Sequence, residues 1–271
     1  ARAVLQLIEP TGGGVSWLGQ PLAGLHRAEL NKYRKNLQIV FQDPLASLDP
    51  RMTVSASMAE PLLTHRPDLT SRERKLQVAE MMERVGLERT LFNRYPHELS
   101  GGQNQRVGIA RAMINKPKLI ICDEAVSALD VSIQAQIIQL LRDLQAEFGM
   151  AMIFISHDLS VVRAISNRIM VLYLGRVVEL GDGEVICSRP LHPYTQSLIS
   201  AVPIPDPDIE RSRRRIKLPG ELPSPLDPRA SLRFLPSRLA AGDTNYVPKL
   251  VEMGANHYVA EHDPLEVIMA D

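Results

Sequence analysis

The chain has 271 residues, of which 45% are apolar, and this is enough to bury a sizeable hydrophobic core. Its 31 Lys and Arg residues balance 31 Asp and Glu residues, so no net charge attracts it to nucleic acid or to anionic lipid. The two cysteines favour a reducing compartment over a disulfide framework, and no apolar run reaches the roughly 20 residues that span a bilayer. We therefore expect a globular chain that attaches to any membrane through protein partners.

The first residues, 1–8, show a helical pattern, but no capping residue precedes them. A helix that begins without a cap suggests that further sequence comes before it. Residues 10–14 then predict a turn, and residues 15–18 predict a short strand. The glycines at 12–14 lack a following Lys and precede a strand rather than a helix, so we interpret them as a turn and not as a phosphate-binding loop.

The next segments predict a strand and a long helix. Residues 27–36 read as a polar helix or loop, and the apolar residues 37–41 as a strand that ends at Gln42. Residues 70–73 (TSRE) have the pattern of a capping box, in which two side chains satisfy backbone N–H groups where a helix begins. We expect this helix to end at Gly86 and to bury one face, formed by Leu76, Ala79, Met82 and Val85.

The stretch from Glu98 to Asp130 predicts a loop, a helix, a buried strand and a second loop. At its start, residues 100–103 (SGGQ) precede an apolar-periodic helix. Their backbone N–H groups and the positive N-terminus of that helix can bind a terminal phosphate. Further on, residues 119–122 (LIIC) are typical of a buried parallel strand.

Two carboxylates follow this strand, at the edge where open α/β sheets bind their ligands. Asp123 suits Mg²⁺, which prefers hard oxygen ligands and keeps several waters. The adjacent Glu124 can polarise an attacking water molecule. The pair therefore indicates nucleotide hydrolysis.

A helix and a strand come next. Asp130 can cap the helix, whose apolar stripe ends near Gly149. Residues 151–155 predict another buried strand, and His157 follows it. A single His after a strand is more often a structural hydrogen-bonding residue than a catalyst, so its role depends on context. Residues 169–180 predict a hairpin around Gly175.

The composition changes after Asp182. Nine of the twenty prolines lie between Pro190 and Pro228, which indicates an extended, turn-rich segment rather than a second enzyme. Residues 210–217 are basic, but with a balanced net charge they fit a solvated linker better than a nucleic-acid site.

Four motifs in this order resemble those of ATP-binding-cassette (ABC) ATPases: LSGGQ before a helix, LIICDE, SALD, and a His after the next strand. The segments FQDPLASLDPRMTV, SALDVSIQAQ and PLHPYTQSLISAVP further resemble the peptide-importer subfamily, the ATP-binding subunits of oligopeptide and dipeptide permeases. The resemblance extends from residue 1 to about Pro228. It implies an α/β fold of the P-loop NTPase type, with a parallel-sheet core, a helical subdomain at about 44–115 that carries LSGGQ, and a remnant antiparallel β subdomain.

The resemblance also implies two domains, a cassette at 1–185 and a Pro-rich C-terminal extension at 186–271. No Lys is followed by Ser or Thr in the chain, so the family's phosphate loop, G-x-x-x-x-G-K-[ST], is absent and we expect the cassette to be N-terminally truncated. The strand that leads into this loop would be missing too, which should leave an exposed edge in the sheet. Asn104 and Ala125 replace the Gln and Pro of many relatives. No Cys follows Cys187, so the iron–sulfur cluster of some relatives is not expected.

The family's roles can be assigned to individual residues. Glu124, His157 and Gln42 match the catalytic residues, and Asp123 and Gln42 match the residues that bind Mg²⁺. A partner's ATP would contact residues of LSGGQ and SALD, namely Ser100, Gly101, Gly102, Gln103 and Asp130.

The resemblance predicts an ATP- and Mg²⁺-dependent subunit of a peptide importer, peripheral to the cytoplasmic face of the bacterial inner membrane. Its implied partners are a homologous ABC ATPase subunit in a heterodimer, two membrane permease subunits and, indirectly, an extracytoplasmic peptide-binding protein, but no nucleic acid. Two alternatives remain open at this point. The chain could be an inactive cassette that at most completes a partner's ATP site, or a soluble cassette protein that acts on ribosomes or DNA.

Overall fold

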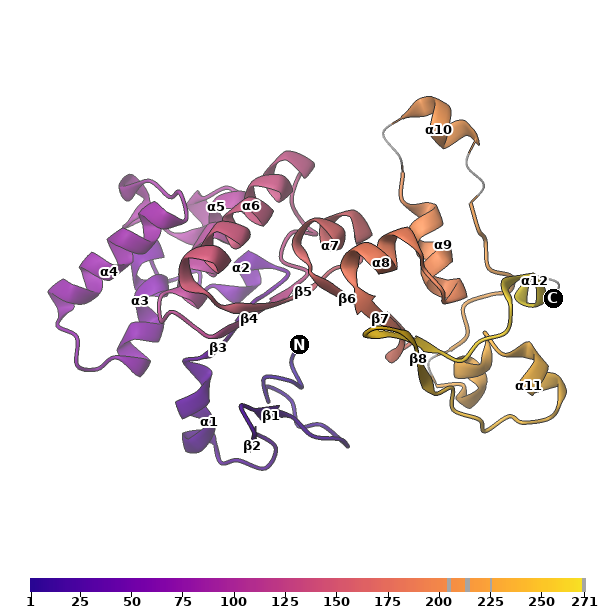
Figure 1. The fold of residues 1–271 in the computed structure, drawn as a ribbon. Helices are drawn as coiled ribbons and strands as arrows, with labels where there is room; N and C mark the ends of the chain where they lie inside the picture. Colours follow the sequence, from indigo (N-terminus) through magenta and orange to yellow (C-terminus); the bar gives the residue numbers. More distant parts are fainter. Residues whose placement is uncertain (204–205, 213–214, 225, 270–271) are drawn as a thin grey trace. The chain divides into compact units, whose positions relative to one another are not determined.

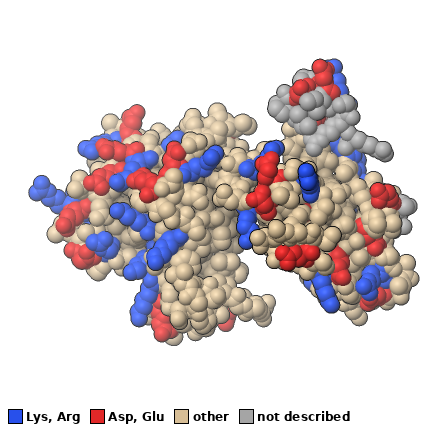
Figure 2. All heavy atoms as spheres, viewed as in Figure 1, with Lys and Arg blue, Asp and Glu red and all other residues tan. Residues whose placement is uncertain are grey.

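A computed structural model describes residues 1–203, 206–212, 215–224 and 226–269 of the chain. They form two compact units, Ala1–His157 and Asp158–Asp271 (Figure 1). Lys and Arg side chains are interspersed with Asp and Glu on the face that Figure 2 shows, in keeping with the balanced net charge. No helix in the described ranges is both long and apolar enough to cross a membrane.

The first unit is built on a parallel sheet with the strand order β3-β4-β5. The strands are β3 (Leu37–Val40), β4 (Leu119–Asp123) and β5 (Ala151–Ile155), as the apolar runs predict. The central strand β4 is buried because helices cover the sheet, and α6 (Val131–Phe148) is one of them. This helix ends at Gly149, which has a φ of 61° that glycine adopts without strain. The predicted core helix is thereby confirmed.

A group of helices lies between β3 and β4 in the sequence. It contains α2 (Pro44–Ser47), α3 (Val54–His65), α4 (Ser71–Arg84) and α5 (Gly101–Met113), with short 3₁₀ turns at Arg89–Leu91 and Pro96–Glu98. Thr70 caps α4 in the predicted capping box, with a 2.7 Å bond from its backbone N–H to Glu73.

The predicted buried face of α4 is partly wrong. Met82 and Val85 are fully buried, but Leu76 is 59% exposed and Val78 and Met81 are buried instead. α4 packs against α3 and α5, and its buried residues begin at Val78, so a pattern that includes Leu76 starts too early.

The N-terminal residues do not form the predicted helix. Residues 2–6 make successive turns and residues 7–8 a bend, and Gln6 has a φ of 52°, which interrupts any helical run. A helix of two turns is marginal unless packing stabilises it. A small antiparallel pair follows, β1 (Ser16–Trp17) with β2 (Gln20–Pro21), and then the predicted polar helix α1 (Arg27–Arg34).

The second unit contains an antiparallel sheet with the order β6-β7-β9-β8. Its strands are β6 (Arg168–Tyr173), β7 (Arg176–Asp182), β8 (Leu250–Gly254) and β9 (His257–Ala260). The hairpin around Gly175 is confirmed. The helices of this unit are α7 (Leu159–Ile165), α8 (Gly183–Ser188), α9 (Pro193–Ala201), α10 (Pro207–Ser212), a 3₁₀ turn (Pro228–Leu232), α11 (Pro236–Ala240) and α12 (Leu265–Ile268).

Two parts of this unit differ from the sequence prediction. The segment 190–228 is not extended throughout, because α9 and α10 interrupt it. A Pro at the first helical position is compatible with a helix, since that residue has no intrahelical N–H bond to make. The hairpin of β8 and β9 also lies beyond the region that the sequence motifs cover, and nothing in the sequence analysis predicted it.

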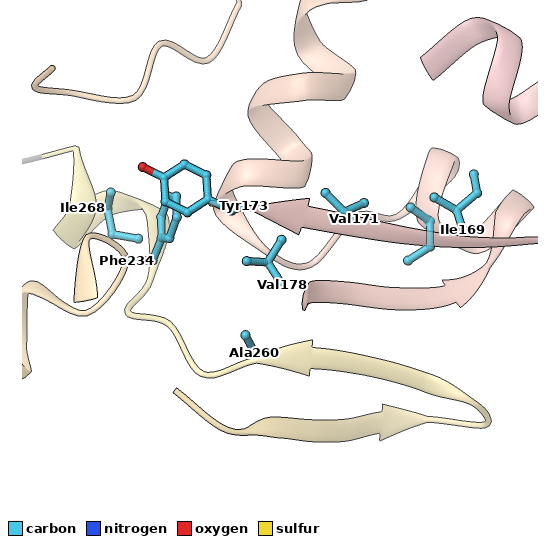
Figure 3. Packing of buried hydrophobic residues seen from close by; sticks show 8 residues of the cluster. Ile169, Val171, Tyr173, Val178, Phe234, Ala260 and Ile268 are labelled. Atoms are coloured by element: carbon cyan, nitrogen blue, oxygen red, sulfur yellow. The ribbon is translucent and has the colours of Figure 1, made fainter. Parts of the chain in front are cut away.

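The core of the second unit joins its early strands to its last residues. Tyr173 on β6 packs edge-to-face against Tyr194 and Phe234, with ring centroids 4.8 and 5.0 Å apart. Figure 3 shows the Tyr173 and Phe234 rings beside Ile268, while Val171, Val178 and Ala260 continue the cluster along the strands. The C-terminal segment is therefore an integral part of this unit.

A buried carboxylate connects three segments of the same unit. Glu179 on β7 is completely buried and accepts hydrogen bonds from the backbone N–H groups of Leu191 (2.8 Å) and His192 (3.1 Å). The Nε2 atom of His257 on β9 lies 2.8 Å from Oε1 of Glu179, the oxygen that also accepts the Leu191 N–H. Burial lowers the pKa of His192 to about 3, so this ring is neutral, and its Nδ1 accepts the Tyr194 N–H at 3.1 Å. Glu179 thus anchors the turn before α9 and the C-terminal hairpin.

We expect Glu179→Ala to lower the free energy of unfolding by about 2–3 kcal/mol, because it leaves two backbone N–H groups and an imidazole buried without an acceptor. Urea denaturation followed by circular dichroism measures this change. Glu184→Ala is the matched control. Glu184 is exposed, and its ion pair with Arg163, at 3.7 Å, is long and solvated. Its removal should therefore change the free energy of unfolding by less than about 0.5 kcal/mol. Equal effects of the two substitutions would contradict an anchoring role for Glu179.

Candidate functional site

The parallel sheet brings the ends of its strands to one edge. Val40 on β3 pairs with Cys122 on β4, and Asp123 pairs with Ile155 on β5. Gln42, Glu124 and His157 follow these paired positions closely in the sequence. Three residues that are far apart in the chain therefore leave the sheet at the same place.

The side chains of Gln42 and His157 both approach Glu124. The Nε2 atom of Gln42 donates a hydrogen bond to Oε2 of Glu124 at 2.9 Å. On the other side, Nδ1 of His157 lies 3.5 Å from Oε1 of Glu124. The carboxylate is 30% exposed and the imidazole 71% exposed, so both groups are open to a ligand or to water. The structure thus brings together the three residues that the sequence predicts as catalytic.

The backbone also orients Glu124. Its φ of 50° lies in the left-handed region, which costs a residue with a β-carbon about 1–2 kcal/mol. Two backbone bonds hold this conformation, from Glu124 N to Ile155 O at 3.0 Å and from Ser127 N to Glu124 O at 3.1 Å. The Ser127 hydroxyl donates to the same carbonyl at 3.0 Å. Such conformations occur at functional sites, and the carboxylate of Glu124 is the group that Gln42 and His157 approach.

The residues available for a metal suit Mg²⁺. Asp123 ends β4 beside Glu124, and its carboxylate together with the amide oxygen of Gln42 would offer hard oxygen ligands. In the described ranges, no three His, Cys, Asp or Glu side chains are grouped so that they could hold a metal ion. Mg²⁺ is usually bound by one or two protein carboxylates and completed by water and phosphate oxygens.

The residues SGGQ form the first turn of α5. Ser100 is the N-cap residue: its hydroxyl accepts the Gln103 N–H at 3.3 Å, and the Gln103 side chain accepts the Ser100 N–H at 2.9 Å. Asn104, a departure from many relatives, is buried and donates to Pro96 O at 2.9 Å. The turn is therefore held in place by hydrogen bonds within the chain and needs no ligand to form.

The two glycines of this turn are in different surroundings. A β-carbon at Gly101 would be 3.7 Å from Leu129 Cδ2, an ordinary contact, whereas one at Gly102 would be 2.9 Å from Ile133 Cγ2. Ile133 is on α6, so α6 itself excludes a side chain at position 102. The sequence analysis explained these glycines only by phosphate binding and missed this packing constraint.

Asp130 occupies the N-cap position of α6, but its side chain makes no capping hydrogen bond. The expected side-chain cap is therefore wrong. The Gln134 amide instead donates to the carbonyl oxygens of Val126 and Leu129, at 3.0 and 3.1 Å, and it stabilises the preceding loop. The Asp130 side chain is exposed and available for an external contact.

Arg111 is a residue that the sequence analysis missed. It is on α5, and its guanidinium donates to Ser47 O at 2.7 Å, at the end of α2. Burial lowers its pKa. The sequence does contain a signal for this residue, because Arg111 is a charged residue within an apolar run. Its neighbours in that run, Ala110, Ala112 and Met113, are buried in the structure. The contact connects the helix that begins with SGGQ to the segment that follows Gln42.

The free edge of the sheet is apolar. β5 lies at the edge and contains no polar side chain, and its Ile153 is 42% exposed. An apolar strand with unpaired backbone groups is a template for a further strand. β5 is therefore an apolar edge strand of this open sheet, and the predicted loss of a neighbouring strand stays a prediction.

Comparison with known proteins identifies the class. The family model described as "ABC transporter" matches residues 1–127. The dimeric structure of a post-hydrolysis state of the ATP-binding cassette MJ0796 bound to ADP and Pi is similar, with a TM-score of 0.61 and 33% identity, over 67% of this chain and 78% of that one. CbiO1 from Clostridium perfringens has the same TM-score at 28% identity, over 70% of this chain and 74% of its own. The chain belongs to the ABC transporter family of ATP-hydrolysing proteins.

A second family model and the similar curated proteins point to one group within the ABC transporter family. The family model "Oligopeptide/dipeptide transporter, C-terminal region" matches residues 178–242. The oligopeptide transport ATP-binding protein OppF of Salmonella typhimurium is 56% identical over 86% of this chain and 70% of its own length, and OppF of Escherichia coli is 55% identical over the same shares. The glutathione import ATP-binding protein GsiA of Pectobacterium atrosepticum is 49% identical over 96% of this chain and 40% of its own length.

These matches confirm the resemblance to ABC ATPases and the α/β fold with a parallel-sheet core. They do not test the domain boundary at residue 185 or the N-terminal truncation, which stay predictions. The roles of the individual site residues also remain to be tested by substitution.

We expect Gly102→Ala to lower the free energy of unfolding by about 1–3 kcal/mol, because α5 and α6 must separate to admit the methyl group. Gly101→Ala is the matched control and should be neutral or stabilising by up to about 1 kcal/mol, since alanine favours a helix. In an Ile133→Ala background the Gly102→Ala penalty should disappear. Chemical denaturation of the four variants measures these differences, and a penalty that persists in the Ile133→Ala background would exclude the proposed clash.

Proposed function

We propose that this chain is the ATP-binding subunit of an importer for oligopeptides or dipeptides, peripheral to the cytoplasmic face of the bacterial inner membrane. The observation that carries the proposal is the approach of Gln42 and His157 to the two oxygens of Glu124. The names of the relatives and the C-terminal family match support the choice of peptides as the transported substrate. The chain would couple ATP binding and hydrolysis to movement of the permease.

Glu124 is the proposed general base, because its carboxylate is oriented, partly exposed and able to accept a proton from water. His157 and Gln42 flank it and would position the water and the terminal phosphate. Asp123 and Gln42 are the residues that would hold Mg²⁺, which supplies positive charge against the phosphate oxygens when bound. The proposed cofactors are therefore ATP and Mg²⁺, and no iron–sulfur cluster is proposed.

The residues SGGQ and Asp130 would contact the nucleotide of a second cassette. Several features support this part of the proposal: the N-terminus of α5 carries a partial positive charge, its first turn is fixed by the capping box, and the Asp130 side chain is exposed. The partner would be a homologous ABC ATPase subunit, forming a heterodimer. Each nucleotide would then lie between the two chains.

Transmission to the membrane would pass through residues 44–61, which follow Gln42. Arg111 supports this role, because it connects the end of α2 to α5 and thereby links the membrane contact proposed here to the SGGQ turn. The proposed partners here are two membrane permease subunits, which receive peptide from an extracytoplasmic binding protein. Nucleic acid is not a proposed partner.

A second candidate function follows from one sequence observation. The 271 residues contain no G-x-x-x-x-G-K-[ST] sequence, whose backbone N–H groups and Lys hold the phosphates of ATP in this family. Under this second candidate, these residues complete the ATP site of a partner through SGGQ. In this case Glu124 would not take part in catalysis.

Two substitutions separate the candidates in an assembled transporter that contains this chain. If Glu124 is the base, Glu124→Gln should lower ATP hydrolysis and peptide uptake by about 10²-fold or more. Under the second candidate it should have no effect, and only Ser100→Asp should lower hydrolysis, because Asp still caps α5 but repels the phosphates of the partner's ATP. Glu147→Gln on the exposed face of α6 is the control. Full activity of both test variants would exclude both functions.

A second prediction concerns membrane attachment. Leu45, on α2 in the proposed permease contact, is 52% exposed. We expect the chain to sediment with membranes only when the permease subunits are co-expressed, and we expect Leu45→Glu to release it into the soluble fraction. Leu76→Glu on α4 is the control, because Leu76 is 59% exposed but outside residues 44–61. Sedimentation without permease subunits, or equal release by both variants, would contradict the assignment.

A further inference from the structure

A pocket of about 240 Å³ lies in the first unit, away from Glu124. Its walls come from α3, α4, the end of α1 and the loop between α5 and β4. Lys35 precedes β3 and Lys116 precedes β4, and because these strands are parallel, the two residues meet at the amino edge of the sheet. The candidate catalytic residues occupy the carboxyl edge, so the two sites are distinct.

The pocket is strongly basic. Its charged or titratable lining residues are Lys35, His65, Arg66, Arg84 and Lys116, with Glu80 as the acidic one. Arg66 is paired with Asp68 at 2.8 Å, and Arg84 with Glu147 at 3.0 Å and with Glu80 at 3.9 Å. Within the part of the chain that the structure describes, neither Lys35 nor Lys116 forms an ion pair. Figure 2 shows Lys and Arg side chains over the region of α1, α3 and α4, mixed with Asp and Glu side chains.

The backbone around the two lysines is fixed. Asn36 O accepts hydrogen bonds from Lys118 N and Leu119 N, at 3.0 and 2.9 Å, which hold the loops before β3 and β4 together. Asn115 Nδ2 donates to Pro61 O at 3.2 Å and attaches the second loop to α3. Lys116 itself has a φ of 51° and is held by a 2.8 Å bond from its N–H to Met113 O. The backbone positions from which the two lysine side chains extend are therefore fixed by the fold.

The pKa of His65 is sensitive to these positive charges. Its pKa is lowered, first by burial and then by the positive charge of Lys35. The other charged groups that line the pocket with it are Arg66, Glu80, Arg84 and Lys116. An anion among these groups would favour protonation of the imidazole.

We propose that this pocket binds a small phosphate-type anion. Its volume is below the roughly 300 Å³ at which pockets for drug-sized ligands begin, so free phosphate or pyrophosphate fits better than a whole nucleotide or a peptide. The site takes its charge from Lys35 and Lys116, neither of which forms an ion pair with a described acidic residue, although Glu80 also lines the pocket. It does not depend on the proposed transport function, since it uses none of the residues assigned to ATP.

An NMR titration of the His65 ring in the 271-residue chain tests the proposal. Inorganic phosphate, added at constant ionic strength against chloride, should shift the His65 signal saturably and raise its pKa, and pyrophosphate should bind more tightly because it carries more charge. The His65→Gln variant assigns the signal. In the double variant Lys35→Gln/Lys116→Gln, phosphate affinity should fall about fivefold or more, whereas Lys75→Gln on the exposed face of α4 should change it by less than about twofold.

Two results would overturn the proposal. One is a His65 shift that phosphate and chloride produce equally, which would indicate screening of charge rather than binding. The other is an unchanged phosphate affinity in the double variant, which would place any anion elsewhere. Circular dichroism of the variants checks that they fold, and the exposure of both lysines makes unfolding an unexpected outcome.

Discussion

The pairing of β4 with β3 and β5 is the interaction on which the first unit depends. Ile120, Ile121 and Cys122 of β4 are at most 1% exposed, and burial raises the pKa of the Cys122 thiol to about 12, so it stays protonated and acts as an apolar side chain. Because both pairs are parallel, all residues that follow the strands collect at one edge and all residues that precede them collect at the other. The approach of Gln42 and His157 to Glu124, and the meeting of Lys35 with Lys116, are two results of the same pairing.

Much of this sheet could be predicted because its strands are short apolar runs with clear ends. Regular spacing also predicted α6 and its end at Gly149, and the TSRE pattern predicted the beginning of α4. The failures occurred where local pattern does not decide the structure. Leu76 continues the spacing of the α4 face but is exposed in the first half of that helix. The C-terminal hairpin depends on Glu179, whose partners His192 and His257 are distant in the sequence, and no local signal predicts such a contact.

At the candidate site, the sequence motifs predicted which residues meet but not how they contact one another. The bond from Gln42 to one oxygen of Glu124, the position of His157 near the other, and the left-handed backbone of Glu124 follow from three strands and a turn together. Arg111 could be noticed as a charge within a buried helix face, yet its partner, the carbonyl of Ser47, is a backbone atom that carries no sequence signature. Motifs therefore predict which chemical groups a site contains. The geometry of those groups depends on the pairing of strands that are far apart in the sequence.

The crowding of Gly102 by Ile133 has a consequence for how this protein can vary. The two positions are on different helices, and the space that one side chain occupies is denied to the other. A larger residue at position 102 should therefore be compatible with folding only together with a smaller residue at position 133, because the smaller residue leaves space for it. Gly101 lacks such a restriction, so the two neighbouring glycines are free to change to very different degrees during evolution, even though one motif contains them both.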